Sequence, residues 1–189
     1  MGDAREACAT AATWPGHRRI AVRLSPVQFR SAGLVHCIAQ ALGMFGLSPD
    51  RLELEITEGT LLEDSESTLA ILYQLRELGL RVAIANFGTG YSSINYLQSF
   101  PFDRIKIDRS FIKDIAESAG SLNIVRAVTA LAKGLGMAAT AEGVETLEQR
   151  RTIAAEGCAE MQGFLVSKAL QADEIEQLLL SPQQRRMAG

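Results

Sequence analysis

The chain has 189 residues, 47% of them hydrophobic, and a mean hydropathy of +0.08, which is enough to bury the core of one globular domain. Its 19 Lys and Arg against 22 Asp and Glu residues give a net charge of −3, and its basic clusters are too short for a nucleic-acid-binding face. No apolar run approaches the roughly 18 residues of a membrane span, and the N-terminus lacks a signal-peptide pattern. We therefore expect a cytoplasmic protein without a transmembrane segment that binds no nucleic-acid polymer.

Cysteine and histidine are too sparse to suggest metal or triad chemistry. The three cysteines are far apart and lack the spacing of metal ligands, so we expect them to be buried, reduced thiols: Cys8, Cys37 and Cys158. The two histidines are isolated in the sequence, which argues against a His-based metal site or a catalytic triad.

Two hydrophobic periods alternate along the chain. Strand periodicity, clearest in "RLELEITE", predicts six strands, over 19–25, 51–58, 81–86, 104–108, 137–144 and 160–166. Helical spacing predicts helices over 31–46, 64–79, a short stretch after Ser92, 121–136, 146–157 and 172–180. For the helix over 64–79, Asp64 or Ser65 is the predicted N-cap and Gly79 the predicted end.

Six strands separated by helices are typical of a parallel sheet with helical crossovers. Two architectures remain open, a doubly wound sheet and part of an eight-stranded barrel. Five strands carry polar groups at or just past their carboxyl ends, namely Arg23, Glu55 with Glu58, Lys106 with Asp108, Glu142 with Glu145, and Gln162. A barrel gathers all its strand ends around one mouth, whereas an open sheet needs chemistry at only one crevice. We therefore predict an α/β fold, a partial TIM-like (β/α) barrel with six of eight strands; a complete barrel takes about 250 residues.

The remaining strand, over 81–86, differs from the other five. It lies at the start of the stretch "RVAIANFGTGYSS", residues 81–93. Its apolar run ends in a glycine loop, a pattern that usually presents a reactive group, yet its tip offers only Ala85 and Asn86. Neither side chain can act as an acid or a base.

Six blocks of sequence in this order resemble the EAL-domain family of bacterial phosphodiesterases that cut cyclic di-GMP: "RLSPVQF", "LELEITE", "FGTGYSS", "FDRIKIDRSFI", "TAEGVET" and "QGFLVSKAL". The resemblance implies a modified eight-stranded barrel whose first two strands, with the Glu-Ala-Leu signature, would precede these blocks. It divides the chain into a remnant of a crossover helix at 1–18, an incomplete EAL-like domain at 19–180, and a polar tail at 181–189.

The family holds two Mg²⁺ or Mn²⁺ ions with carboxylates and one Asn, and these ions activate a water and polarise the phosphate. By resemblance, Glu55 and Asn86 occupy positions of metal ligands, and Lys106 and Glu142 occupy catalytic positions. The resemblance also implies ligand-binding positions for Gln162, Arg23 and Phe164, and loop-bracing carboxylates at Glu58 and Glu145.

Three positions depart from the family pattern. Arg23 stands where the family has a metal-binding Asn, and Ala85 and Asn86 stand where it has two metal-binding aspartates. A guanidinium repels a nearby cation, and Asn86 keeps one neutral oxygen without the charge that makes a Mg²⁺ site bind. We hypothesise that Arg23 pairs with Glu55 in place of a metal. On this set we expect binding of Mg²⁺ or Mn²⁺ to be weak or absent.

Three functions remain open. One is an EAL-type domain of cyclic di-GMP signalling that is catalytically impaired and acts as a nucleotide sensor or as an interaction module, with a homodimer or regulatory protein as partner. Another is an active metal-dependent phosphodiesterase that yields pGpG. The third is a non-functional fragment, because a barrel that lacks two strands exposes two sheet edges.

Overall fold

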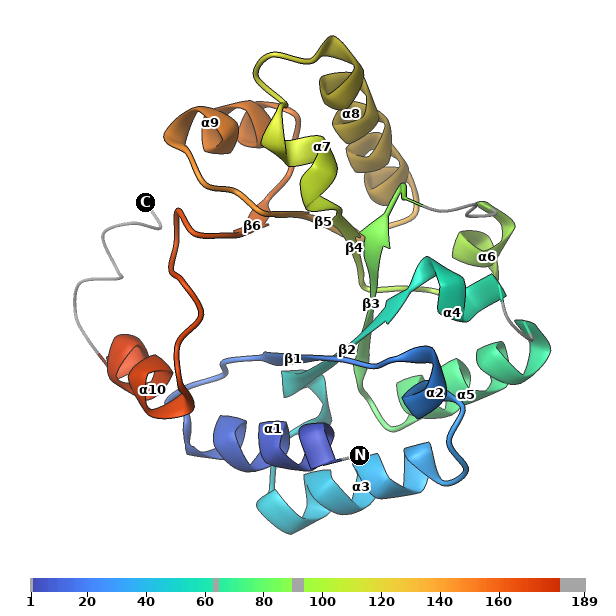
Figure 1. The fold of residues 1–189 in the computed structure, drawn as a ribbon. Coiled ribbons are helices and arrows are strands. Elements are labelled where there is room, and N and C mark those ends of the chain that lie inside the picture. Colours follow the sequence, from blue (N-terminus) through green and yellow to red (C-terminus); the bar gives the residue numbers. More distant parts are fainter. Residues whose placement is uncertain (1, 63–64, 90–93, 181–189) are drawn as a thin grey trace.

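The computed structural model describes residues 2–62, 65–89 and 94–180 (Figure 1). The strands are β1 (Ile20–Arg23), β2 (Leu52–Thr57), β3 (Arg81–Phe87), β4 (Arg104–Ile107), β5 (Ala138–Glu142) and β6 (Glu160–Gln162). The helices in these ranges are α1 (Gly2–Thr13), α2 (Pro26–Phe29), α3 (Leu34–Phe45), α4 (Glu58–Leu62), α5 (Ser65–Glu77), α6 (Ile94–Ser99), α7 (Arg109–Lys113), α8 (Ala119–Gly134), α9 (Leu147–Ala155) and α10 (Ala172–Leu180), with a 3-10 turn η1 at Pro49–Arg51. Each of the six predicted strands is present.

The strands form one parallel sheet in the order of the chain. Each strand pairs with the next one along the sequence, from β1 at one edge to β6 at the other. A doubly wound sheet reverses its strand order at a switch point, whereas a consecutive order is how a (β/α) barrel grows. Figure 1 shows the sheet curled around a central space with helices on its outer side. The prediction of a partial TIM-like barrel is therefore confirmed, and the doubly wound alternative is excluded.

The alternating sequence of β2 separates two buried faces. Leu52, Leu54 and Ile56 face the outer helices and are fully buried. Glu53 and Glu55 lie on the opposite face, yet they are only 5% and 9% exposed. The pattern that predicted a strand thus distinguishes helix-facing from interior-facing residues rather than core from solvent, as a closed or nearly closed barrel requires.

Helix ends follow local capping chemistry. Thr146 begins α9 with a capping box, in which its hydroxyl accepts from the Gln149 backbone while Gln149 reaches back. Asp64, one of two N-caps predicted for α5, lies outside the described residues, and Ser65 is the first residue of that helix. Gly79 ends α5 as predicted, with a φ of +90° that favours glycine.

All the strands except β3 are shorter than their sequence pattern indicated, and the ends of β5 and β6 have a local cause. β5 ends at Glu142 because Gly143 takes a left-handed φ of +74°. β6 ends at Gln162 because residues 163–167 form a turn, in which the Val166 amide donates to the Gly163 carbonyl at 3.0 Å. Helices α2, α4 and α7, of four or five residues each, were not predicted, because so few residues show no helical period.

The sheet remains open between its edge strands β1 and β6. In Figure 1 the chain after β6 runs across this open side towards α10. From residue 159 to residue 179 no side chain is fully buried, whereas the rest of the domain has a continuous apolar core. The open side is therefore the least packed part of the described chain.

Two further features of the structure are the burial of the cysteine thiols and the length and polarity of the helices. All three cysteines are free; Cys8 and Cys158 are buried as predicted, while Cys37 is half-buried. Within residues 2–62, 65–89 and 94–180, no helix has both the length and the apolar character that crossing a bilayer would take.

Candidate functional site

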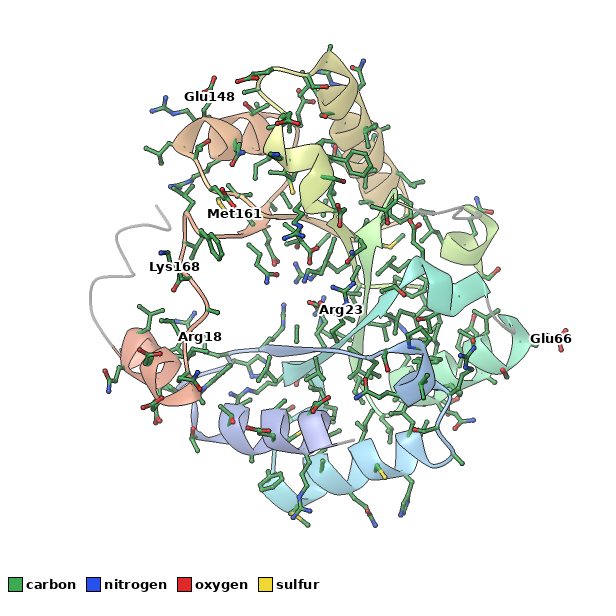
Figure 2. The ribbon with its side chains drawn as sticks, viewed as in Figure 1. Arg18, Arg23, Glu66, Glu148, Met161 and Lys168 are labelled. Atoms are coloured by element: carbon green, nitrogen blue, oxygen red, sulfur yellow. The ribbon has the colours of Figure 1, made fainter. Side chains whose placement is uncertain are left out.

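The interior of the curled sheet is lined by polar side chains. Because strand residues alternate between faces, the pairing register places one set of positions inward on every strand. These positions include Arg23, Glu53, Glu55, Arg104, Lys106, Thr140, Glu142, Glu160 and Gln162. Many of them, together with residues of β1, line an open cavity of about 220 Å³ that reaches from the β1 edge to the β6 edge. Figure 2 shows Arg23 beside the central space, on the side formed by β2 and β3.

Lys106 lies at the centre of the part of this site nearest the carboxyl ends of the strands. Its Nζ lies 2.6 Å from Glu55 Oε1, 2.7 Å from Glu142 Oε1 and 3.0 Å from Gln162 Oε1. Lys106 donates hydrogen bonds to Glu55 and Gln162 and forms an ion pair with Glu142. Four residues that the sequence predicted for the site are therefore brought together, from strands β2, β4, β5 and β6.

Arg23 and Asn86 form the rim of the site. The Arg23 Nη2 donates to Asn86 Oδ1 at 2.6 Å. Although β1 and β2 pair Arg23 directly with Glu55, the ion pairs of the described residues include none between these two side chains. The hypothesis of an Arg23–Glu55 ion pair is therefore wrong, because Glu55 is held by Lys106 and Arg23 by Asn86.

Asn86 has an unusual backbone. Its φ is +56°, the only positive φ at a non-glycine residue in the described part of the chain, and the pairing of β3 with β4 shifts register at this point. Asn tolerates the left-handed region better than most residues, and a bulge re-aims the side chain. The bulge gives Asn86 its position opposite Arg23.

The glycine loop after β3 is braced as predicted on one side. Glu58 Oε1 accepts from the Gly88 amide at 2.8 Å, and Glu58 is buried. Gly88 has a φ of +94°, and a Cβ there would come within 2.9 Å of the Phe111 ring, so only glycine fits. Glu145 is exposed and has no side-chain hydrogen bond to the described residues. Because loop residues 90–93 lie outside those residues, its bracing role stays a prediction.

Phe164 differs from the other predicted ligand-binding residues. Its side chain is 63% exposed, and it does not line the central cavity. It follows Gln162 by two residues, on the stretch of chain that crosses the open side of the barrel. Its role in ligand binding stays a prediction.

A lower layer of charges, which sequence reasoning did not single out, lies beneath the site. The Arg104 Nε is 3.0 Å from Glu53 Oε1, and its Nη1 donates to Thr140 Oγ1 at 2.6 Å and also contacts Glu160. Burial alone would lower the pKa of Arg104, but its contacts with Glu160 and Glu53 outweigh this effect and raise it. Sequence spacing could have identified this layer. Glu53 and Arg104 precede the site residues Glu55 and Lys106 by two positions, so each lies on the same strand face as that site residue.

The residues at the rim do not fit a pair of divalent ions. Ala85 contributes a fully buried methyl group, and the amide oxygen of Asn86 is already bonded to a guanidinium. Among residues 2–62, 65–89 and 94–180, no three or more His, Cys, Asp or Glu side chains are grouped so that they could share a metal ion. Hard divalent cations need several oxygen ligands, most of them charged. The donor set therefore disagrees with two-metal chemistry.

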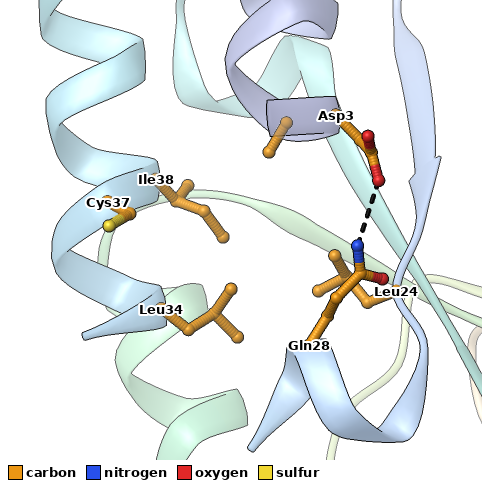
Figure 3. A pocket seen from close by; sticks show the side chains of 7 residues that line it. Asp3, Leu24, Gln28, Leu34, Cys37 and Ile38 are labelled. Carbon is orange, nitrogen blue, oxygen red and sulfur yellow. Dashed lines mark hydrogen bonds between the residues drawn. The ribbon is translucent and has the colours of Figure 1, made fainter. Parts of the chain in front are cut away.

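A second cavity, between α1, α2 and α3, is too small to be a ligand site. It measures about 10 Å³ and is lined by Leu24, Leu34, Cys37, Ile38 and their neighbours (Figure 3). Its polar wall is closed by a hydrogen bond from Gln28 Nε2 to Asp3 Oδ2 at 3.0 Å. Such a volume holds about one water molecule.

Comparison with known proteins shows what this chain is similar to. The model of the EAL domain family matches residues 4–169. The bifunctional diguanylate cyclase/cyclic di-GMP phosphodiesterase MucR of Pseudomonas aeruginosa is 43% identical over 174 residues, which are 90% of this chain and 25% of that protein. The chain spans between 21% and 25% of the length of the first three curated relatives it matches.

Two solved structures extend this similarity to the fold and to bound ligands. The PaMucR phosphodiesterase in complex with c-di-GMP superposes with a TM-score of 0.87 at 41% identity, covering 91% of this chain and 71% of that one. Klebsiella pneumoniae BlrP1, in a complex with manganese and cyclic di-GMP, superposes with a TM-score of 0.81 at 33% identity, covering 87% of this chain and 42% of that one.

Proposed function

Since this chain belongs to the EAL domain family, we propose that it is a domain of cyclic di-GMP signalling whose catalysis is impaired and which acts as a nucleotide-sensing or protein-interaction module. The first part of this statement rests on the family match and on relatives that are cyclic di-GMP phosphodiesterases. The second part rests on the residues of this chain. Because the chain covers about a quarter of such relatives, the activity of the whole protein is itself part of the proposal.

The bond between Arg23 and Asn86 is the observation that carries the proposed impairment. It joins the tips of β1 and β3 at the two positions where the family resemblance implies metal ligands. A fixed positive charge there opposes a metal ion, and the neighbouring Ala85 has no ligand atom. Without the ions, nothing in the set can lower the pKa of an attacking water as a metal does.

The same residues favour retention of nucleotide binding. Lys106 and Gln162 present an ammonium and an amide along the central cavity, and Arg23 presents a guanidinium at the rim. Phosphodiester oxygens accept charge-assisted hydrogen bonds from such groups without a metal. A cyclic dinucleotide carries two phosphodiester charges, and we propose that it is the ligand.

The open side of the barrel supports an interaction role. Phe164 and Val166 are 63% and 58% exposed on the chain that crosses this side, and β1 and β6 are the edge strands of the sheet that the described residues form. We propose that a second copy of the chain or a regulatory protein is the partner. We also propose a cytoplasmic location, which the three free thiols support.

The alternative is an active metal-dependent phosphodiesterase that produces pGpG. One observation favours it: Glu55, Glu142 and Gln162, which the family resemblance places at the metal and substrate site, all contact Lys106. The alternative requires that Arg23 move away from Asn86, so that the Asn86 oxygen can bind a metal ion, against the bond between them.

A titration with cyclic di-GMP separates these functions. Calorimetry in EDTA and in Mn²⁺, with chromatography for pGpG, is expected to show binding in both buffers and no product. The matched control is the variant Arg23→Asn/Ala85→Asp/Asn86→Asp, which restores metal-ligand chemistry and is expected to make binding respond to Mn²⁺. Formation of pGpG by the natural chain would overturn the proposed impairment, and absence of binding in both buffers would overturn the sensor role.

A further inference from the structure

Two cations of β4 reach across β5 to the edge strand β6. Arg104 contacts the carboxylate of Glu160, and Lys106 donates to Gln162 Oε1 at 3.0 Å. Arg104 and Lys106 are two positions apart on β4, as are Glu160 and Gln162 on β6, so both contacts lie on the interior face of the sheet. The contact between Arg104 and Glu160 is the one nearer the amino ends of the strands.

The short edge strand β6 has few other contacts that hold it in place. It consists of three residues, and in the sheet that the described residues form it pairs with β5 alone. Its middle residue, Met161, is half-buried, while Glu160 and Gln162 are exposed. A segment with few backbone bonds and little apolar packing shifts or opens at low cost. The side-chain contacts to β4 therefore decide much of where β6 lies.

Arg104 is the fixed end of its contact with β6. Its side chain is 8% exposed, its Nε lies 3.0 Å from Glu53 Oε1 of β2, and its Nη1 donates to Thr140 Oγ1 of β5 at 2.6 Å. A planar guanidinium carries five donors, so it can serve three strands at once. The side chain of Glu160 is 51% exposed. Burial therefore does not fix Glu160, whereas its contact with the anchored guanidinium does.

We propose that Arg104 and Glu160 are positioning residues for Gln162. Arg104 acts through Glu160 to set the place of β6 relative to β4, and this keeps Gln162 within hydrogen-bond reach of Lys106. A hydrogen bond weakens steeply as its geometry departs from the optimum, so a small displacement of β6 is enough to lose this one. The effect on cyclic di-GMP rests on the proposed function, in which Gln162 is a ligand-binding residue; the placement of Gln162 itself does not.

The direction of the change in affinity separates positioning from a simple effect of charge. Loss of the Glu160 carboxylate removes a negative charge from the wall of the central cavity, which by electrostatics alone strengthens the binding of an anion. Loss of a positioning contact weakens binding instead. We expect Glu160→Ala to bind cyclic di-GMP about fivefold more weakly than the natural chain, the size of one net hydrogen bond. Glu160→Gln keeps an oxygen for Arg104 and is expected to recover most of this loss.

Two measurements on the full chain test the proposal. In calorimetry, Glu160→Ala/Gln162→Ala is expected to bind cyclic di-GMP no more weakly than Gln162→Ala alone, because residues that act through one another are not additive. In nuclear magnetic resonance without nucleotide, the side-chain amide signals of Gln162, identified by their absence in Gln162→Ala, are expected to move in Glu160→Ala and to stay in place in Glu160→Gln. The matched control is Glu156→Ala, which removes another glutamate–arginine pair, at 2.7 Å from Arg126, and should leave these signals unchanged.

Three results would overturn the inference. They are unchanged Gln162 signals in Glu160→Ala, tighter binding of cyclic di-GMP by this variant, and additive losses of affinity in the double variant. The pair of Arg104 with Glu53 remains in every variant, so the fold is expected to be retained, and circular dichroism checks this. If the natural chain binds no cyclic di-GMP, the sensor role fails, and the Gln162 signals alone decide whether Glu160 positions this residue.

Discussion

Arg104 and Lys106 face the interior from the same strand, two residues apart, and each ends among carboxylates. Pairing is necessary because a buried charge without a partner costs several kcal/mol, in the range of about 3–5 kcal/mol when one partner is removed. Arg104 contacts Glu53 and Glu160, and Lys106 contacts Glu55 and Glu142. Each layer therefore has one cation between two carboxylates.

Loss of Arg104 is expected to destabilise the fold strongly. Arg104→Met keeps most of the side-chain volume but leaves the buried Glu53 with only the longer 3.9 Å pair to Arg81, so we expect a loss of about 3 kcal/mol of unfolding free energy in urea titrations. Arg126→Met is the matched control, because Arg126 makes a two-bond pair with Glu156 at 2.8 and 2.7 Å on the exposed surface. Surface pairs contribute little, and equal losses in the two variants would contradict a buried role for Arg104.

Cys158 makes the stability of the fold depend on pH at the alkaline end. Burial raises the pKa of its thiol from 9.0 to about 11. The unfolded chain therefore loses this proton at lower pH than the folded chain, so stability is full below pH 9 and falls as pH rises towards 11. We expect about 1 kcal/mol less unfolding free energy at pH 10 than at pH 8 from this group. In Cys158→Ala the decline between these pH values should be smaller; an equal decline would assign it to other groups.

At the scale of the elements, a glycine lies near each end of β5, and the two glycines meet different structural requirements. Gly136, before the strand, has a φ of +72° and nothing near its missing Cβ. Gly143, after the strand, has a φ of +74°, but a Cβ there would come within 2.5 Å of Arg109 Cβ. The first position needs glycine only for its backbone angle, and the second also needs it for space.

Alanine at these two glycines is expected to separate the two requirements. Gly136→Ala should cost about 1 kcal/mol for the left-handed backbone. Gly143→Ala should cost about 3 kcal/mol, because overpacking against α7 is added to the same backbone term. Thermal unfolding of both variants measures the difference. If both lose the same stability, the close approach of Gly143 to Arg109 is not a constraint on the fold.

The elements also show which features of the structure the sequence pattern could predict. Alternation in β2 and helical spacing in α8 and α10 identified elements that are present, because each pattern repeats over several residues. The polar strand ends predicted a shared site, and Glu55, Lys106, Glu142 and Gln162 do meet there. The partners of individual charges could not be predicted in the same way. Arg23 bonds to Asn86 rather than to its neighbour Glu55 because a bulge in β3, invisible in the sequence, re-aims the asparagine.

At the scale of the whole molecule, stability is uneven across the sheet. β2 to β5 have neighbours on both sides, while β1 and β6 are edges and the chain after β6 has no fully buried side chain as far as residue 179. An exposed strand edge has backbone groups that can pair with another chain. The open side is thus where a further strand, from this protein or a partner, would add most to stability.

Hydrogen exchange is expected to follow this gradient. Backbone amides of β3 and β4 should exchange slowest, near the rate set by global unfolding, and amides of α10 should exchange much faster through local opening. Mass spectrometry of peptides after timed exchange measures both. Protection of α10 equal to that of β3 would show that the open side is covered in solution.

The central claim is that the bond between Arg23 and Asn86 occupies the rim positions where the family resemblance implies metal ligands. Crystals grown with Mn²⁺ and cyclic di-GMP, with anomalous diffraction data collected at the manganese edge, test it most directly. The expected map has no manganese peak bonded to Glu55 or Asn86, with Arg23 still on Asn86. A manganese peak bonded to Asn86 and Glu55, with the Arg23 guanidinium displaced from Asn86, would contradict the claim.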